Sequence, residues 1–238
     1  MQPVNTAESI ASYTEHVRPD PYKDRNSMEF KFRSRRFARI QALIEAILAE
    51  KGEATILDLG GRETYWQIGA DFIEANRERL RITLVNLEKD PVEDHELFET
   101  LTGDATDPAL MGDRRFDLVH SNSVVEHVGE WPDMQRFAEN TRRLGKRYYV
   151  QTPNYWFPFE PHFRTAGFQY LPRAARAALI QRVSLGFFPR IQNADDARDI
   201  IRHHHLISTR QMRALFPDAD VLHEKFMGLN KSIIAIQG

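Results

Sequence analysis

Polar and glycine residues directly follow a short apolar run near residue 60, where their chemistry suits ligand binding. The run Ala54–Leu59 contains Asp58 and ends at Gly60 and Gly61. A glycine turn has no side chain between the backbone and a ligand, and a carboxylate beside it can hold a cationic group. In an open parallel sheet, ligands bind outside the carboxyl ends of the strands, which is where such a turn would lie.

Two further apolar runs end in residues of the same character. Asn86 and Glu88 follow the run 82–85, and an amide or acid there can bind ribose hydroxyls. Gly103-Asp104-Ala105 follows the run 98–102, where a carboxylate can accept a hydrogen bond from an adenine amino group. Each signal alone is weak, because turns and helix caps use the same residue types. Their common order along the chain predicts a site for an adenosine-containing ligand.

Several other chemistries are disfavoured or excluded by the sequence. The segment Gly60–Tyr65 does not supply the G-x-G-x-x-G fingerprint, which disfavours NAD-dependent oxidoreduction. No Gly-Lys-Ser/Thr follows any apolar run, so a P-loop is absent. The chain has no cysteine, which excludes disulfides, thiolate metal sites and cysteine nucleophiles.

Alternating strands and helices are predicted to position these residues. Asn26 followed by Glu29 predicts the start of a helix over 27–50, whose apolar residues recur at helical spacing. Short apolar runs predict strands, and the 3.6-residue period predicts further helices. The predicted strands are 54–59, 82–85, 98–102, 116–119, 147–150, 220–223 and 231–236, and the predicted helices are 27–50, 65–80, 132–143, 173–183, 195–205 and 208–216. This order indicates an α/β doubly wound, mainly parallel sheet.

The alternation divides the chain into four parts. An N-terminal segment and helix (1–52) precede a ligand-binding core (53–153), and a closing helix and strands (207–238) complete that core. Between them, residues 154–206 break the alternation and are rich in proline and aromatic residues. We predict that this part is a helical insertion that covers the substrate and excludes water, with at least one aromatic side chain from 155–159 in a pocket.

Composition limits the class of protein. Of the 238 residues, 42% are hydrophobic, which excludes intrinsic disorder. The net charge of -2 argues against a protein that coats nucleic acid or a membrane through bulk charge. The first twenty residues lack the apolar core of a signal peptide, and no uncharged apolar run is long enough to cross a bilayer. The sequence predicts a cytoplasmic protein without nucleic-acid or membrane partners.

Several motifs resemble those of one enzyme family. The segment 56–61 (ILDLGG) is similar to the first motif of class I S-adenosylmethionine-dependent methyltransferases, and 116–128 (FDLVHSNSVVEHV) to the fourth motif of their small-molecule branch. The segment 151–162 resembles the stretch after the fifth strand in a bacterial subgroup, and 226–235 resembles the last strand of the family. The resemblance implies a Rossmann-like seven-stranded sheet with an antiparallel last strand. It also implies methyl transfer from S-adenosylmethionine to an oxygen or nitrogen of a small molecule, such as a sugar or secondary metabolite.

The resemblance also assigns residues to the cofactor. Its predicted contacts are Asp58, Gly60, Gly61, Asn86, Glu88, Asp104, Ala105 and Ser121. The chain departs from the family at two places. Arg62, Glu63 and Thr64 stand where further glycines are usual, and Asn86 aligns with the ribose-binding acid, so Glu88 is its expected substitute.

Histidine and glutamate residues are candidates for taking the proton of a hydroxyl acceptor. His162 and Glu160, in a proline-braced part of the insertion, are the first choice, and His127 is the next. Glu126 and His127 are expected to open a helix after the fourth strand, where they either face the cofactor or complete the first turn of that helix. The run His203–His205 does not predict a metal site, because consecutive helical residues point in three directions, and we expect no metal. Asp195-Asp196 similarly indicates ordinary charge at a helix start.

Two other functions stay open from the sequence alone. A non-catalytic module with a degenerate cofactor site would bind S-adenosylmethionine poorly or not at all. An RNA methyltransferase would use a basic surface, for which the stretch Lys31–Arg36 is the candidate; on an amphipathic helix, that stretch is expected to be a solvated face.

Overall fold

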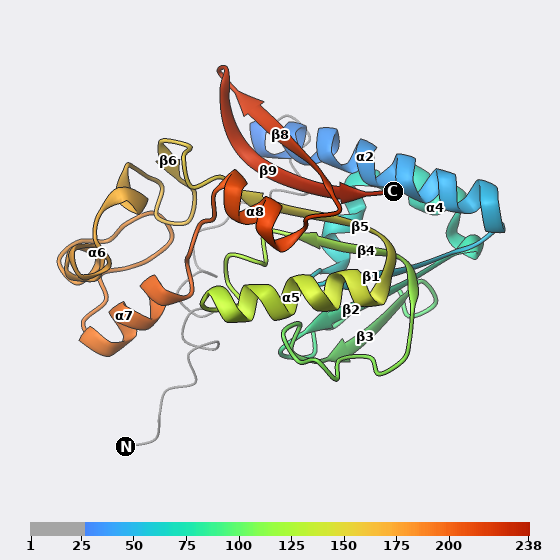
Figure 1. Ribbon diagram of the computed structural model, residues 1–238, viewed down its shortest axis with the longest axis horizontal. Helices are drawn as coiled ribbons and strands as arrows, with labels where there is room; N and C mark the ends of the chain where they lie inside the picture. Colours follow the sequence, from blue (N-terminus) through green and yellow to red (C-terminus); the bar gives the residue numbers. More distant parts are fainter. Residues whose placement is uncertain (1–26) are drawn as a thin grey trace.

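The computed structural model describes residues 27–238, which form a mixed α/β structure around one large sheet (Figure 1). The seven strands have the spatial order β3-β2-β1-β4-β5-β9-β8. The strands are β1 (Ala54–Leu59), β2 (Leu80–Asn86), β3 (Phe98–Thr102), β4 (Phe116–Asn122), β5 (Gly145–Pro153), β8 (Asp220–Phe226) and β9 (Leu229–Gln237). This confirms the predicted Rossmann-like, doubly wound sheet.

Strand direction places the candidate residues at one edge of the sheet. β1 pairs in parallel with β2 and β4, β2 with β3, and β4 with β5. Only β9 runs antiparallel, between β5 and β8, as the resemblance implied. The strand order reverses between β1 and β4, so the carboxyl ends of these two strands flank the crevice where ligands bind in such sheets.

The long helix α2 (Met28–Lys51) covers one face of the sheet. Ser27 begins it, because its hydroxyl accepts a hydrogen bond from the Phe30 amide at 3.0 Å; the predicted cap, Asn26, lies outside the described residues. The apolar stripe behaves as predicted: four of its five side chains, Phe37, Ile40, Ile44 and Ile47, are buried against the sheet. The basic stretch is not wholly a solvated face, because Arg36 is buried and pairs with Glu224 of β8 at 2.9 Å.

The predicted helix over 65–80 is broken into short pieces. They are α3 (Glu63–Trp66), a 3-10 turn (Gln67–Gly69), α4 (Ala70–Ala75) and a second 3-10 turn (Arg77–Arg79). Gly69 lies so close to α2 that a β-carbon there would stand 1.8 Å from the Phe37 ring. A regular helix was expected because the apolar spacing is local, whereas this contact joins segments distant in sequence.

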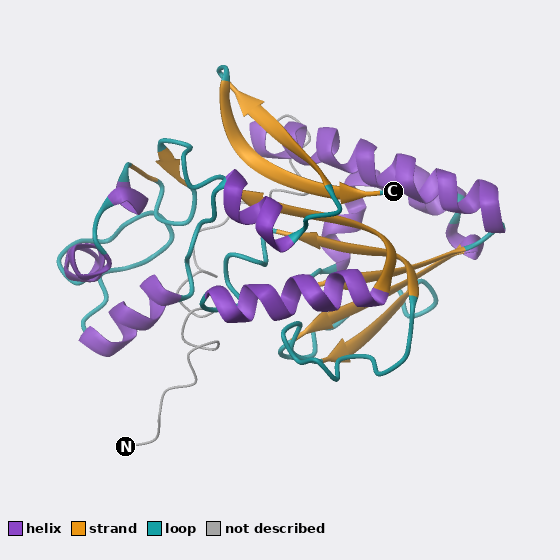
Figure 2. Ribbon diagram, in the orientation of Figure 1, coloured by secondary structure: helices purple, strands orange, loops and turns teal. Residues whose placement is uncertain are grey.

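The opposite face is covered by α5 (Trp131–Leu144) and α8 (Thr209–Leu215), which pack against each other and the sheet (Figures 1 and 2). The cap of α8 is as predicted: Ser208 accepts from the Gln211 amide, and the Gln211 side chain accepts from the Ser208 amide. α5 begins at Trp131, so Glu126 and His127 do not open a helix as expected. They lie in the turn between β4 and α5.

The segment after β5 forms a lobe beyond the carboxyl ends of β4 and β5 (Figure 1). It contains a two-stranded ribbon, β6 (Phe159–Glu160) with β7 (Thr165–Ala166), a 3-10 turn (Phe168–Tyr170), α6 (Arg173–Ile180) and α7 (Ala194–Arg202). Both helices match the predicted ones within a few residues. The lobe has its own hydrophobic cluster, centred on aromatic and aliphatic residues such as Phe163 and Ile200.

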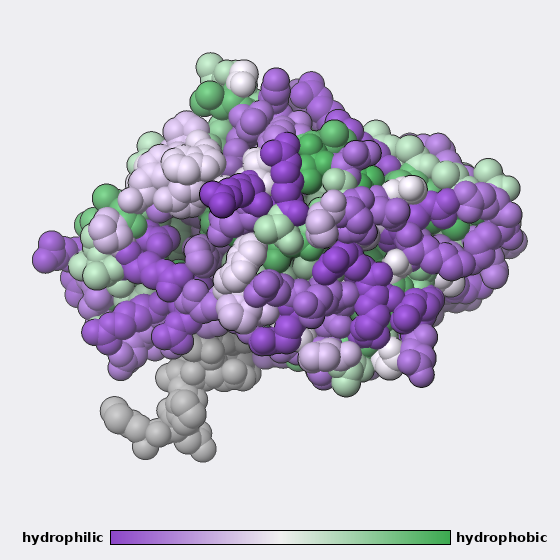
Figure 3. All heavy atoms as spheres, viewed as in Figure 1, coloured by the Kyte–Doolittle hydropathy of each residue, from purple (hydrophilic) through white to green (hydrophobic). Residues whose placement is uncertain are grey.

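The face of the molecule drawn in Figure 3 is mainly polar. In the view of Figure 3 hydrophilic residues predominate, and apolar colour gathers at the tip of the β8–β9 hairpin, where Met227 is 86% exposed. None of the described helices is long and apolar enough to cross a membrane.

Candidate functional site

The glycine turn after β1 packs tightly against its own protein. Gly60 has φ +74°, and a β-carbon there would lie 2.5 Å from Cγ2 of Val124. A β-carbon on Gly61 would lie 1.8 Å from a carboxylate oxygen of Asp58. The sequence attributed these glycines to the approach of a ligand. In the structure, contact with Val124 and Asp58 is already enough to require them.

Asp58 does not face an open crevice, which corrects the expectation that it holds a cationic group of a ligand. It is fully buried, and Nδ1 of His120 donates to one of its oxygens at 2.7 Å. Nε1 of Trp66 donates to the other oxygen at 3.0 Å. The rings of Tyr65, Trp66 and Tyr149 surround His120. Asp58 therefore ties β1 to β4 and to α3 within the core.

Ser121 is likewise directed into the protein. It is fully buried, and its hydroxyl donates to the Leu59 carbonyl at 2.9 Å, so its side chain is not placed to contact a cofactor as expected. The next residue, Asn122, has a side-chain oxygen that can accept a hydrogen bond from a ligand. Its Oδ1 is buried without a hydrogen-bond partner among the described residues, at the carboxyl end of β4. A buried amide oxygen in this state is a strong candidate to receive a ligand's donor.

Asn86 and Glu88, at the end of β2, have different environments. Nδ2 of Asn86 donates to the Gly61 carbonyl at 2.8 Å, so Asn86 fixes the glycine turn. Glu88, two residues further, is exposed and keeps its carboxylate available at the strand end. This arrangement fits the prediction that Glu88 substitutes for the ribose-binding acid.

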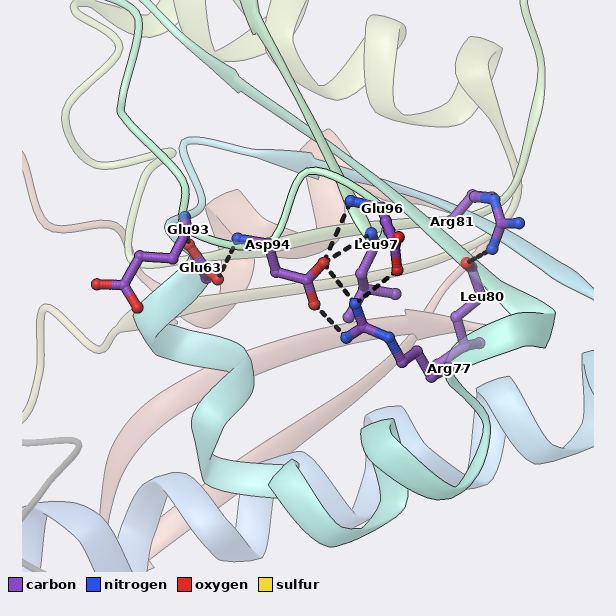
Figure 4. Close-up of polar contacts among 8 residues, drawn as sticks. All are labelled: Glu63, Arg77, Leu80, Arg81, Glu93, Asp94, Glu96 and Leu97. Atoms are coloured by element: carbon purple, nitrogen blue, oxygen red, sulfur yellow. Dashed lines mark hydrogen bonds and ion pairs between the residues drawn. The ribbon is translucent and has the colours of Figure 1, made fainter.

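The β2–β3 loop, which carries Glu88, is held in place by hydrogen bonds to Glu63 and by an ion pair with Arg77 (Figure 4). The Glu63 carboxylate accepts from the backbone amides of Glu93 and Asp94 at 2.6 and 3.2 Å. Arg77 binds the Asp94 carboxylate through both terminal nitrogens, one of them at 2.8 Å. The hydrogen bond from Arg77 lowers the pKa of Asp94. Glu63, a bulky replacement for a glycine, thus points to the β2–β3 loop.

Asp104 and Ala105 follow β3. Oδ1 of Asp104 accepts from both the amide and the hydroxyl of Thr106, each at 2.8 Å, which fixes the turn, while the residue stays exposed. The Ala105 carbonyl accepts from Nδ2 of Asn140 in α5 at 2.9 Å. Their roles toward adenine stay predictions.

A second group of candidate side chains lies in the turn after β4, at its junction with the lobe. Ser123 begins the turn at φ +59°, a conformation that L residues adopt rarely and that clusters at functional sites. Glu126 is fully buried, and one carboxylate oxygen accepts from the Thr152 hydroxyl at 2.9 Å. Its other oxygen has no partner among the described residues. Burial raises the pKa of Glu126 to about 7.

The predicted base candidates meet His127 at this junction. Nδ1 of His162 donates to the Glu160 carboxylate at 2.7 Å, and Glu160 is buried. The ring of His162 lies 4.8 Å from the ring of His127, centroid to centroid. The sequence thus found three residues that the fold brings together from two distant segments.

His204 joins these rings, a neighbour that the sequence did not assign. Its ring centroid lies 4.7 Å from that of His127 and 4.9 Å from that of His162. Burial lowers the pKa of His204 well below its usual value, so the ring is neutral. The three consecutive histidines were expected at helical positions, but α7 ends at Arg202 and they follow it. Nδ1 of His203 binds the Asp199 carbonyl and Nδ1 of His204 binds the Ile200 carbonyl.

A cavity of about 320 Å³ opens beside this junction, in the lobe. Tyr155 and Tyr170 form an aromatic wall, which confirms that an aromatic residue of 155–159 lines a pocket. Arg173, Arg176 and His205 also line it. Nε of Arg176 is buried without a partner among the described residues, and burial lowers the pKa of this guanidinium. The cavity therefore suits a planar ligand with an anionic group.

Comparison with known proteins supports the fold. No protein-family model matches the chain. A 1,6-didemethyltoxoflavin-N1-methyltransferase from Burkholderia thailandensis, solved with 1,6-didemethyltoxoflavin and S-adenosylhomocysteine, aligns at a TM-score of 0.52 and 17% identity, over 97% of this chain and 84% of that chain. An O-methyltransferase family protein from the same organism aligns at a TM-score of 0.46 and 14% identity, over 85% of this chain and 57% of that chain. The first alignment shows that the chain has the Rossmann-like fold of that methyltransferase.

Sequence relatives cover a smaller region. Uncharacterized proteins from two strains of Mycobacterium tuberculosis are 34% identical over 59 residues, which is 25% of this chain. The match spans 20% of the length of each relative.

Proposed function

We propose that the protein transfers a methyl group from S-adenosylmethionine to an oxygen or nitrogen of a small molecule. The observation that carries the proposal is the pairing of two sites at one sheet edge. Strand-end acceptors follow β2, β3 and β4, and a histidine–glutamate cluster joins the turn after β4 to the lobe that also contains an aromatic cavity. The motifs of the sequence and the fold shared with a methyltransferase of Burkholderia thailandensis support it.

The residues after the strands fit the cofactor. Glu88 would accept from ribose hydroxyls and Asp104 from the adenine amino group, since both carboxylates are exposed at strand ends. Asn122, with its unpaired and buried Oδ1, would accept from the ammonium of the methionine part. When bound, S-adenosylmethionine supplies an electrophilic methyl group, so the protein's own task is to position the acceptor and exclude water.

The lobe would hold the acceptor. Its aromatic wall favours a planar molecule, and Arg176 favours one that carries a negative charge. Proton removal from a hydroxyl acceptor falls to the junction, where Glu160 orients His162 and fixes the proton on Nδ1. With the proton on Nδ1, Nε2 is the ring nitrogen that can accept a proton. A cytoplasmic location and the lack of nucleic-acid and membrane partners stay predictions from the sequence.

Calorimetry with S-adenosylmethionine and S-adenosylhomocysteine tests the proposal. Glu88→Ala should weaken binding by about 1.5–3 kcal/mol, the range for hydrogen bonds to a charged group. Glu93→Ala is the matched control, because it removes an equal charge from the same loop and Glu93 takes part there through its backbone amide. Absence of heat for the wild type with either ligand would contradict the proposal, and equal affinities for the two variants would remove the role of Glu88.

Turnover tests the acceptor side. His162→Ala and Glu160→Gln should lower turnover by about 10²–10⁴-fold, the usual contribution of a positioned acid or base, while cofactor affinity stays near that of the wild type. Thermal stability measured on the same samples separates chemistry from folding, because Glu160 also binds the Phe163 amide. Full turnover, or activity that falls only in step with stability, would contradict this assignment.

A further inference from the structure

We propose that Glu126, His127 and His162 form a binding site for a divalent transition-metal ion. Each offers one ligand atom, and these three atoms all lie within 4.8 Å of one another. Two imidazole nitrogens and one carboxylate oxygen are a known set for Zn²⁺ and Fe²⁺, and the set leaves coordination positions open for water or substrate. A metal ion at this point would make the sequence-based expectation of no metal wrong.

The hydrogen bonds of the two histidines occupy Nδ1 of each ring and leave Nε2 as the nitrogen that can bind a metal. Nδ1 of His127 lies 2.7 Å from the His203 carbonyl, and Nδ1 of His162 lies 2.7 Å from the Glu160 carboxylate. Carbonyl and carboxylate oxygens only accept, so each Nδ1 carries the proton. With the proton on Nδ1, the lone pair of the imidazole is on Nε2. Metal-binding histidines almost always donate their other N–H in this way.

Glu126 has the features of the third ligand. Its side chain is fully buried, although a lone carboxylate is rarely buried without compensation. The Thr152 hydroxyl binds one oxygen, and the other lacks a partner among the described residues. A cation at this point would compensate the buried charge.

His204 completes the shape of the site as a positioning residue. Its buried ring packs almost perpendicular to those of His127 and His162, at interplanar angles of 81° and 73°. Its own Nδ1 is bound to the Ile200 carbonyl at 2.7 Å. The ring therefore restricts the orientation of both ligands. Ligand atoms around a tetrahedral zinc ion are roughly 3.3 Å apart, given zinc–nitrogen bonds of about 2.0 Å, so binding draws the three groups closer by about 1.5 Å at most.

The metal would deepen the proposed methyl transfer, on which this part of the inference rests. A bound ion would lower the pKa of an acceptor hydroxyl that it contacts, and His162 would then serve as a metal ligand in place of the general base described under the proposed function. The acceptor proton passes to solvent, and the acceptor oxygen bonds to the methyl carbon. The bond between that carbon and sulfur breaks, and sulfur keeps its electron pair.

Metal binding is tested on full-length protein without a histidine tag. After dialysis against a chelator and then buffer, Co²⁺ is added and visible absorption is recorded, and Zn²⁺ binding is measured by calorimetry. We expect one bound ion per chain and a Co²⁺ absorption spectrum typical of an ion with nitrogen and oxygen ligands. Mg²⁺ should not bind comparably, because it prefers oxygen ligands. The wild type failing to bind one Zn²⁺ or Co²⁺ per chain overturns the proposal.

Variants identify the ligands. His127→Ala, His162→Ala and Glu126→Gln should each abolish stoichiometric Zn²⁺ binding and change or remove the Co²⁺ spectrum. Thr152→Val, which removes a partner of one ligand, should weaken Zn²⁺ binding about 10–100-fold. His95→Ala, an exposed histidine in the β2–β3 loop, is the control and should bind as the wild type does. Circular dichroism of the metal-free proteins verifies that each variant folds. The proposal is wrong if the folded variants His127→Ala, His162→Ala and Glu126→Gln all bind Zn²⁺ as the wild type does.

The two proposals fail separately. Calorimetry with S-adenosylmethionine is carried out on the metal-free protein, because the strand-end residues do not belong to the metal site. Cofactor binding without any metal binding would overturn the metal site alone. Metal binding without cofactor binding would overturn the proposed methyl transfer and leave the site in place.

Discussion

Replacing Gly60 by alanine should destabilise the protein by about 2–5 kcal/mol. The residue has φ +74°, and an L side chain in this region costs about 1–2 kcal/mol. The new β-carbon would also stand 2.5 Å from Cγ2 of Val124, well inside contact distance. Overpacking of this kind typically costs about 1–3 kcal/mol. The two contributions act at one site, so their sum is an upper range.

Urea unfolding of a small set of variants separates the two contributions. Gly228→Ala is the matched control, with φ +82° and nothing within 4 Å of the added carbon, so it should lose only about 1–2 kcal/mol. In a Val124→Ala background, Gly60→Ala should also cost only about 1–2 kcal/mol, because the methyl group at 2.5 Å is gone. The reasoning is refuted if Gly60→Ala costs no more than Gly228→Ala, or if Val124→Ala leaves its cost unchanged.

This prediction decides how the proposed cofactor site should be probed. Gly60→Val would weaken cofactor binding through damage to the turn, whatever the ligand contacts. Glu88 is a better position, since it is exposed and its side chain can be shortened without disturbing the packing around Gly60 and Asp58.

Two further predictions concern stability. Asp94→Asn should destabilise the protein at neutral pH, because Arg77 lowers the pKa of Asp94 in the folded state. A carboxylate of this kind stabilises the folded protein at pH values above its unfolded pKa of about 3.9. That stabilisation is lost as the pH falls through the lower pKa of the folded state. Thermal unfolding of both proteins should show a difference at pH 7 that disappears in strong acid, and a difference independent of pH would contradict the assignment. Glu224→Leu should cost about 3–5 kcal/mol, because it leaves the buried Arg36 without its carboxylate. Arg36→Met in the same chain should recover most of this loss in urea unfolding, and no recovery would show that the charge is not the cause.

Local sequence patterns predicted the central sheet well, because its strands are buried and therefore appear in the sequence as short apolar runs. β1 and β3 were predicted to the residue, since each is a short run of strand-forming residues bounded by turn residues. The antiparallel place of β9 came from the family resemblance and not from periodicity. The break at Gly69 could not be predicted from local spacing, and the ring that requires a glycine there lies 32 positions earlier in the sequence.

The candidate site was predicted in part for the same reason. Residues at strand ends were found, because the end of a strand fixes their place in the fold. The sequence did not predict whether a side chain at a strand end faces a crevice or the core. Asp58 and Ser121 face the core. His127 and His162 were both chosen for their chemistry, but their contact with His204 depends on how the lobe folds back against the turn after β4.

The lobe is also closed at its base, and this has a consequence for how such proteins can change. Asn154 and Ile207 form a parallel bridge, so the lobe leaves the sheet and returns to it at neighbouring points. Its two helices pack on each other around a hydrophobic cluster of their own. A segment with joined ends and a separate core can be lengthened, shortened or exchanged at little cost to the rest of the chain. Under the proposed function, acceptor preference can therefore evolve by exchange of this one segment as long as Glu160 and His162 are kept, while the strand ends proposed to bind the cofactor stay as they are.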